Sequence, residues 1–327
     1  LSQPELFAEI VTQNQAMQSI FHYVEAVAGG NQPVLIHGES GTGKELIAMA
    51  LHKVGRVDDP WLAINVAGID EETFADTLFG HARGAYPGAD KARKGLIEQA
   101  GTGTLFLDEI GSLSESSQLK LLRVLQDGEF FPVGSDRPHR SNARFVVATN
   151  QELKKLVKDG RFRSDLYYRL KVHQLEIPPL RNRLEDIPLL LEHFLGQAAA
   201  EFNKKKPTPP SELAVLLQTY HFPGNIRELQ SMVYDAVSQH HQRKMSMDVF
   251  KKAMGRTGDA DEVDTDEEMP AVQFGEQLPT LKQAVRQLLM EAMQRTQGNQ
   301  TMMATMLGIS RPALSKRLKN LREEDEE

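Results

Sequence analysis

The stretch from Gly38 to Glu45, which reads Gly-Glu-Ser-Gly-Thr-Gly-Lys-Glu, constrains the fold most strongly, because it joins an apolar run to a helix-like segment. Glycines in such a loop let backbone N–H groups curl around phosphate oxygens, and the helix N-terminus adds its positive dipole end. Lys44 can reach the β- and γ-phosphates. The stretch predicts a nucleotide-binding loop, although a glycine-rich turn is the alternative. The residues expected at the nucleotide are Gly38, Glu39, Ser40, Gly41, Thr42, Gly43, Lys44 and Glu45.

Polar residues at the ends of two later apolar runs strengthen this interpretation. The run Thr104–Leu107 is followed by Asp108 and Glu109, and another run ends at Asn150. We expect Asp108 to position magnesium through its waters and Glu109 to polarise the water that attacks the γ-phosphate. Asn150 is placed to sense that phosphate. The alternative is that the two acids cap the following helix.

The fold class follows from apolar runs that alternate with helix-like stretches. The runs that we interpret as buried strands are Pro33–Ile36, Trp61–Ile64, Thr104–Leu107 and Arg144–Ala148. Helix-like patterns such as Glu45–Val54 and Ser117–Gln126 lie between them. This alternation favours an α/β domain with a mostly parallel sheet, assigned to residues 1–177. Residues 178–255 are predicted to form an all-helical lid, with a break at His221–Gly224.

Charge divides the rest of the chain. The whole chain has a net charge of −7, but the charges are unevenly distributed. Residues 256–280 carry eight acids and one arginine, whereas residues 281–322 carry eight basic residues and one acid. The acidic segment has too few apolar groups to fold, so 256–279 is predicted to be a flexible linker. Residues 323–327 form an acidic tail. The chain begins with Leu1 rather than Met, so we expect it to be a piece of a longer protein.

The chain contains no cysteine, which excludes disulfides and thiolate metal sites. No apolar run approaches the roughly 18 residues that span a bilayer, and no signal peptide is visible. We therefore expect a cytoplasmic protein without a membrane partner.

Residues 280–322 are predicted to form a separate all-α helix-turn-helix domain. An apolar stripe at helical spacing over 281–293 is followed by a short helix over 301–307, a turn at Gly308 and a helix that starts at Arg311. Two helices around such a turn, after a third, are typical of DNA-binding domains. A helical bundle with a solvated basic face is the alternative. The residues expected at base edges are Arg311, Pro312, Ser315 and Lys316, and those expected at phosphates are Arg317, Lys319 and Arg322.

Residues 10–254 resemble the AAA+ central domain of bacterial enhancer-binding proteins, the NtrC-like activators of sigma-54 RNA polymerase. The matching strings are Gly38–Glu45, Leu78–His81, Gly103–Glu109, Leu121–Gln126, Ala148–Asn150, Phe162–Leu170, Pro178–Arg181 and Phe222–Leu229. The stretch from Gly298 to Leu318 is similar to the Fis-type domain that ends this family. The resemblance accounts for Glu45, where a phosphate loop normally has Ser or Thr. It implies an ATPase whose Mg²⁺ is held mainly by phosphates, water and Asp108.

Further roles come from the resemblance alone. Asn65 matches an asparagine that restrains the catalytic glutamate, and Arg227 matches a lid arginine that faces the γ-phosphate. Arg163 and Arg169 match arginine fingers that enter a neighbouring subunit's site, although surface salt bridges are the alternative. The resemblance therefore implies a ring, usually a hexamer. It also implies dimeric DNA-binding domains on palindromic sites, and a family that includes regulators of two-component systems.

The loop that contacts sigma-54 in this family, Gly-Ala-Phe-Thr-Gly-Ala, departs here from the pattern. The matching residues are Gly84, Ala85, Tyr86, Pro87, Gly88 and Ala89. Proline removes a hydroxyl and an N–H and fixes φ, so the loop tip should be stiffer. Two interpretations follow. The loop engages sigma-54 through Tyr86, or the chain is a nucleotide- or ligand-controlled DNA-binding regulator that acts without sigma-54.

Overall fold

The computed structural model describes residues 1–240, 245–256, 280–296, 299–307, 309, 311 and 313–318. The chain divides into two compact units, Leu1–Lys206 with His221–Tyr234, and Pro207–Tyr220 with Asp235–Glu327. The predicted limits of 1–177 and 178–255 stay predictions, because these units interleave along the sequence. The predicted linker from residue 257 on, the tail, Pro312, Lys319 and Arg322 lie outside the described residues.

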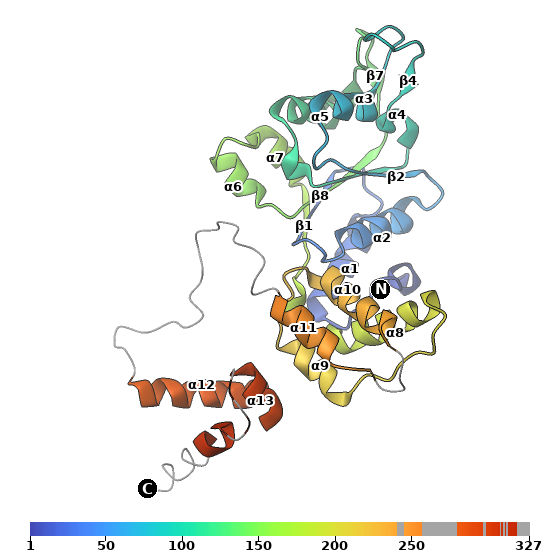
Figure 1. Cartoon of the computed structure of the whole chain (residues 1–327). Coiled ribbons are helices and arrows are strands. Elements are labelled where there is room, and N and C mark those ends of the chain that lie inside the picture. The colour runs from blue at the N-terminus through green and yellow to red at the C-terminus, as the bar shows by residue number, and fades with distance from the viewer. Residues whose placement is uncertain are drawn as a thin grey trace. The chain divides into compact units, whose positions relative to one another are not determined.

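A five-stranded parallel sheet organises the first unit (Figure 1). Its strands, in spatial order, are β2 (Trp61–Asn65), β5 (Thr104–Asp108), β8 (Arg144–Thr149), β1 (Val34–His37) and β9 (His173–Glu176). Every residue of β8 is buried, as expected for a strand that is covered on both faces. The four predicted strands and the mostly parallel sheet are confirmed, and β9 adds a fifth strand.

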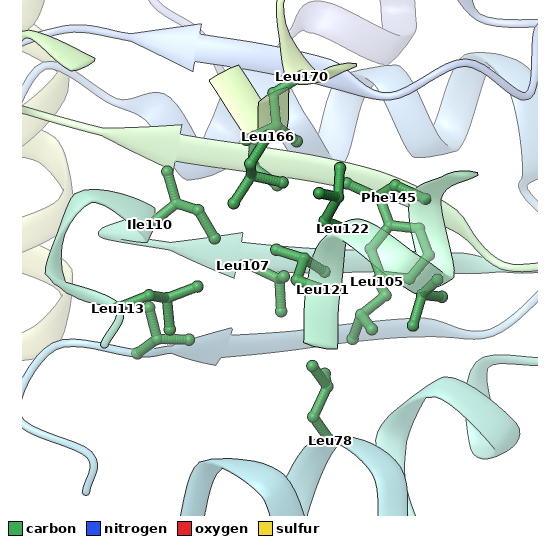
Figure 2. Close-up of a cluster of buried hydrophobic side chains, with 14 of the residues drawn as sticks. Leu78, Leu105, Leu107, Ile110, Leu113, Leu121, Leu122, Phe145, Leu166 and Leu170 are labelled. Atoms are coloured by element: carbon green, nitrogen blue, oxygen red, sulfur yellow. The ribbon is translucent and has the colours of Figure 1, made fainter. Parts of the chain in front are cut away.

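Helices cover both faces of this sheet. The helices before the lid region are η1 (Pro4–Phe7), α1 (Gln15–Val27), α2 (Lys44–Arg56), α3 (Glu71–Phe79), α4 (Leu96–Ala100), η2 (Ile110–Ser112), α5 (Glu115–Asp127), α6 (Leu153–Lys158) and α7 (Ser164–Leu170). Side chains alternate along each strand, so Leu105 and Leu107 pack with α3, α5 and α7, whereas Phe106 packs with α1 and α2. Figure 2 shows the first of these cores, where Leu121 and Leu166 approach the sheet. Burying one such leucine contributes about 1.5–3 kcal/mol.

Two short hairpins lie beyond α3 and α5, at the same end of the first unit (Figure 1). The strands β3 (Gly80–His81) and β4 (Arg93–Lys94) pair antiparallel, as do β6 (Glu129–Phe130) and β7 (His139–Arg140). An isolated bridge joins His81 to Val133. Residues 84–89 therefore lie in the connection between β3 and β4.

The helical region begins with η3 (Leu180–Asn182), η4 (Leu184–Asp186) and α8 (Ile187–Glu201), and it continues with α9 (Ser211–Gln218), α10 (Asn225–Ser238) and α11 (Asp248–Arg256). The predicted break precedes α10. Phe222 and Asn225, on either side of Pro223 and Gly224, have positive φ angles of 49° and 52°.

The C-terminal part contains α12 (Leu281–Arg295) and α13 (Gln300–Met306), and residues 311 and 313–318 are helical. Thr280 starts α12 with a capping box that involves Gln283, a motif that satisfies two N-terminal donors. A small core holds these helices together, formed by Leu289, Ala292, Met303, Ala304, Leu314 and Leu318. The predicted helix-turn-helix is confirmed to this extent.

Candidate active site

The phosphate loop connects β1 to α2 and is shaped by two glycines. Gly41 and Gly43 have φ angles of +75° and +97°, a region that residues with a Cβ rarely adopt. A Cβ on Gly41 would lie 2.3 Å from the carbonyl oxygen of Gly224, so only glycine fits there. The amide of Ile226 donates to the Gly41 carbonyl at 3.0 Å. The loop is therefore in backbone contact with the start of α10.

Lys44 begins α2 and is buried, with its ammonium group inside the curve of the loop. Its Nζ donates to the carbonyl oxygens of Gly38 at 2.9 Å and Glu39 at 3.3 Å, and lies 3.9 Å from Oε1 of Glu109. A buried cation held among acceptors is suited to bind phosphate oxygens, which offer the same hydrogen bonds with more negative charge.

The acids at the end of β5 have the predicted position. Glu109 follows Asp108 in the left-handed region, at φ 59° and ψ 44°, and its side chain does not cap η2. The backbone N–H of Glu109 donates to Oδ1 of Asp108 at 3.0 Å, and the backbone N–H of Asn150 donates to Oε2 of Glu109 at 3.4 Å. A non-glycine residue in this conformation stores about 1–3 kcal/mol of strain, which is characteristic of functional sites.

Asn65 lies at the end of β2, in register with Asp108. Its side-chain oxygen accepts the amide of Ala67 at 2.8 Å. Within the described chain it makes no hydrogen bond to Glu109, whose carboxylate instead faces Lys44. The restraining role of Asn65 stays a prediction.

An ion pair that the sequence analysis missed holds the phosphate loop from the lid side. Arg181 donates two hydrogen bonds to the carboxylate of Glu39, at 2.7 Å and 2.5 Å, and Nδ2 of Asn225 adds a third at 3.1 Å. The hydrogen bonds from Arg181 hold the pKa of Glu39 below its ordinary value and raise the pKa of Arg181. The only sequence signal was an acid inside a loop that binds anions, which requires a cationic partner.

Two further residues fasten the same loop. Arg183 is fully buried and donates to the Thr42 carbonyl at 3.0 Å, and its burial lowers its pKa. Asn225 donates to the Ser40 carbonyl at 3.0 Å and accepts the amide of Leu180 at 2.8 Å. Asparagine tolerates the left-handed conformation that this bridge requires. The predicted Arg227 donates to Oγ of Ser40 at 3.1 Å.

The pair formed by Glu39 predicts a pH-dependent contribution to folding stability. Because the folded pKa of Glu39 is lowered, its contribution is present above the ordinary value of 4.5 and is lost as the pH falls. We expect Glu39→Gln to reduce the free energy of unfolding at pH 7 by up to about 1 kcal/mol, since the pair is partly exposed. This difference should shrink in acid. Urea unfolding over a pH series checks this, with the exposed Glu5→Gln as control. An identical pH slope in Glu39→Gln and the wild type would contradict it.

The predicted arginine fingers lie on or beside α7. Arg163 donates to both carboxylate oxygens of Asp165, at 3.1 Å and 2.8 Å, which raises the pKa of Arg163 and lowers that of Asp165. Arg169 donates to the Leu125 carbonyl at 2.9 Å. In the described part of the chain, neither guanidinium group contacts the phosphate loop of its own chain.

The loop at 84–89 is closed by its own backbone. The Gly84 amide donates to the Ala89 carbonyl at 2.8 Å, and Gly84 and Gly88 have φ angles of +80° and +97°. Tyr86 is 44% exposed at the tip, so its ring is accessible to a partner.

The predicted DNA-contacting residues that the structure describes share two properties. Each is exposed and helical, as the geometry requires for base or phosphate contact: Arg311, Ser315, Lys316 and Arg317.

Comparison with known proteins decides the family. Residues 10–176 match the Sigma-54 interaction domain, 181–267 match the AAA+ ATPase lid domain, and 280–321 match the bacterial regulatory protein, Fis family. The chain belongs to the sigma-54 activator family. The predicted resemblance is thereby confirmed, and this sigma-54 activator is an AAA+ ATPase that binds ATP and carries a DNA-binding helix-turn-helix.

Relatives support the assignment along most of the chain. The DNA-binding transcriptional regulator NtrC of Rhizobium meliloti (strain 1021) is 38% identical over 336 residues, which cover 95% of this chain and 69% of NtrC. The Nif-specific regulatory protein of Azotobacter vinelandii is 48% identical over 224 residues, covering 68% and 42%. The crystal structure of NtrX from Brucella abortus with ADP has a TM-score of 0.72 at 30% identity and covers 98% of this chain and 71% of NtrX. In the described part of this activator, no helix is long and apolar enough to cross a membrane.

Proposed function

We propose that this activator hydrolyses ATP at sites shared between neighbouring copies in a hexameric ring, and that it uses the energy to remodel sigma-54 RNA polymerase through residues 84–89. The observation that carries the proposal is the convergence of three elements on one loop. Nζ of Lys44 lies 3.9 Å from Oε1 of Glu109, the backbone N–H of Asn150 donates to Oε2 of the same carboxylate at 3.4 Å, and Arg227 donates to Oγ of Ser40. This grouping supports the proposal that a base, a cation and a phosphate sensor surround one phosphate position.

Each residue has a role in phosphoryl transfer to water. The loop amides and Lys44 hold the β- and γ-phosphates, and Glu109 accepts the proton of the attacking water. Asn150 and Arg227 contact the γ-phosphate. For Asn65 to restrain Glu109 before ATP binds, its side chain would need a contact to Glu109 besides the hydrogen bond that it accepts from Ala67.

The residues present fit Mg²⁺ held through water. Within the described chain, Oδ2 of Asp108 takes no hydrogen bond, whereas Oδ1 accepts the Glu109 amide. The described residues contain no group of three or more His, Cys, Asp or Glu that could hold a metal. Magnesium typically binds to one or two carboxylates with phosphate oxygens and waters, so Asp108 supplies the protein's share. The bound ion would neutralise charge on the phosphates.

Assembly of several copies into a ring would add the arginine fingers that the ATP site of a single chain lacks among its described residues. Among the described residues, the contacts of the Arg163 and Arg169 guanidinium groups lie at Asp165, Glu115 and Leu125 rather than at the phosphate loop, and a guanidinium group at a neighbour's γ-phosphate would offset transition-state charge. Both arginines therefore act on the next copy of the ring.

The C-terminal domain is proposed to bind palindromic DNA as a dimer. Val285, Leu288 and Met293 on α12 are exposed by 39%, 55% and 39%, and these apolar groups suit burial against a second copy. Arg311, Pro312, Ser315 and Lys316 would then read bases in each half-site, while Arg317 and Lys319 contact phosphates.

Pro87 favours a second candidate function, in which nucleotide controls DNA binding and the loop has no role at sigma-54. Proline cannot donate a backbone hydrogen bond to a partner, and its ring fixes the backbone at the tip.

Exchange of Pro87 for threonine separates the two candidates. We expect the native chain to form open complexes with sigma-54 polymerase, and Pro87→Thr to change their rate by no more than about tenfold, the scale of one hydrogen bond. ATP turnover, measured in parallel, should be equal in both and serves as the control for folding. Loss of open complexes in the native chain with rescue by threonine would favour the second candidate. Failure of both chains with intact turnover would also overturn the proposal.

A further inference from the structure

The lid, residues 181–267, donates hydrogen bonds to three consecutive carbonyl groups of the phosphate loop, each at 3.0 Å. The donor and acceptor pairs are Asn225 with Ser40, Ile226 with Gly41, and Arg183 with Thr42. Asn225 donates through Nδ2 and Arg183 through its guanidinium group, whereas Ile226 donates through its backbone N–H. Two of the three contacts therefore depend on a side chain and can be removed by substitution.

The geometry of the peptide group turns these three contacts into an orientation of the loop's N–H groups. In a planar trans peptide, the carbonyl of one residue and the N–H of the next point in opposite directions. Carbonyls that point to the lid donors therefore direct the N–H groups of residues 41–43 away from them. Within the described chain, none of these N–H groups donates to an acceptor, although Thr42 is buried. Successive N–H groups of this kind bind anions, so phosphate oxygens are the acceptors that they lack.

Asn225 is held so that its side chain cannot turn freely. Its Nδ2 donates to the Ser40 carbonyl and to Oε2 of Glu39, and its Oδ1 accepts the backbone N–H of Leu180. Both donors and the acceptor atom of the amide are thus in use, and the residue is fully buried. Its φ of 52° lies in the left-handed region, which asparagine tolerates. The direction of the Ser40 carbonyl is therefore fixed by a rigid neighbour.

Arg183 holds the Thr42 carbonyl from a second buried position. Its donor is charged, so this hydrogen bond is stronger than one from a neutral amide. A strong donor on a carbonyl oxygen also polarises the peptide group and strengthens the N–H on its other side. The negative charge of Asp186, which is buried as well, offsets part of the cost of burying the guanidinium group.

We propose that Asn225 and Arg183 are positioning residues that, with the backbone of Ile226, hold three consecutive N–H groups of the phosphate loop toward the phosphates of ATP. They act through the peptide groups of the loop. This inference rests on the proposed function, in which the loop binds the β- and γ-phosphates. Because the lid supplies all three donors, the affinity of the loop for phosphate depends on the contact between lid and loop.

ATP binding by Asn225→Asp tests the proposal in the whole chain. Aspartate keeps the shape of the side chain and the acceptor for Leu180, but it cannot donate to Ser40. We expect the Kd for ATP, measured by calorimetric titration, to rise about 10- to 100-fold, the scale of one hydrogen bond to a charged group. The affinity for adenosine, which has no phosphate, should stay unchanged. The KM for ATP should rise while kcat stays near the wild-type value, as expected when uniform binding is lost.

A second variant separates the lost donor from the added charge. Asn225→Gly removes the side chain without adding a charge, and glycine adopts a positive φ readily. Its Kd for ATP should rise about three- to tenfold, the scale of one neutral hydrogen bond. Asn203→Asp is the matched control, because Asn203 is exposed, has a φ of 51°, and its side chain makes no hydrogen bond to a described residue. The ATP affinity of Asn203→Asp should equal that of the wild type.

The role of Arg183 is tested by a pair of substitutions. Arg183→Met keeps an apolar stem but has no donor for Thr42, so its Kd for ATP should rise about 10- to 100-fold. Arg183→Lys keeps a charged donor and should restore part of the affinity. A cooperative thermal transition in each variant shows that the chain is folded. Wild-type affinity in Arg183→Met would exclude Arg183 from the proposed role.

Lys44→Ala distinguishes failure of this inference from failure of the proposed function. Wild-type ATP affinity in Lys44→Ala would contradict the proposed phosphate site and the inference with it. If Lys44→Ala loses affinity but both variants of Asn225 keep it, only the positioning role is overturned. A loss in Asn225→Asp that is absent in Asn225→Gly would assign the effect to charge and would also overturn it. An equal loss of affinity for adenosine would mark Asn225 as a residue that only stabilises the fold.

Discussion

Glu109→Gln is expected to stop ATP hydrolysis while ATP stays bound. Glutamine has nearly the same shape and can still accept the hydrogen bond from the backbone N–H of Asn150, but it cannot take a proton from water. The turnover number should fall by about 10²- to 10⁴-fold, the usual contribution of a general base. Phosphate release in single-turnover conditions measures this loss.

The affinity of Glu109→Gln for ATP should rise, although its turnover falls. Oε1 of Glu109 lies 3.9 Å from Nζ of Lys44, so the carboxylate competes with phosphate for this cation. Removing its charge should therefore tighten ATP binding, which a fluorescent ATP analogue can measure. Glu152→Gln is the matched control, because Glu152 is exposed and its side chain makes no capping hydrogen bond to α6. Turnover of Glu109→Gln within tenfold of the wild type would contradict the role of Glu109 as base.

Arg163→Ala is expected to lower turnover by about 10³-fold or more, the range measured for arginine fingers. Within its own chain Arg163 contacts only carboxylates among the charged groups described, at Asp165 and Glu115, so the folded subunit needs it little. Arg163→Lys should restore little of the turnover, because an ammonium group lacks the planar, forked donors of a guanidinium group. Steady-state ATPase assays at several protein concentrations measure both.

A mixing experiment tests whether the finger acts on a neighbour. Glu109→Gln and Arg163→Ala are each inactive alone, but mixed rings contain interfaces that pair an intact base with an intact finger. Activity should reappear on mixing. Arg161→Ala, at an exposed arginine nearby, should be active alone and serves as the control. Mixtures no more active than the separate variants would place the finger in its own chain.

The central strands could be predicted because each contains at least three consecutive apolar residues. In β5 the first four residues are buried, so the run from Thr104 to Leu107 is visible in the sequence. The edge strand β9 gives no such signal because Leu175 is its only apolar residue, whereas the other edge strand, β2, begins with four apolar residues. The start of α10 was predictable from Pro223 and Gly224, which interrupt a helical pattern.

The site was only partly predictable. The loop and the acids after β5 are local patterns, and sequence order alone places them at one edge of a parallel sheet. The bond between Glu39 and Arg181 joins residues 142 positions apart, and neither residue type signals the other. Burial of Arg183 was equally hidden, because arginine is normally a surface residue.

At Gly41 and Gly224, the backbone of the phosphate loop packs directly against the backbone that precedes α10, with no side chain between them. Side chains absorb small shifts by changing rotamer, but backbone pressed against backbone cannot. A shift of the loop on nucleotide exchange would therefore displace the start of α10 by a similar amount. The orientation of the first turn of α10 would therefore depend on which nucleotide the loop holds.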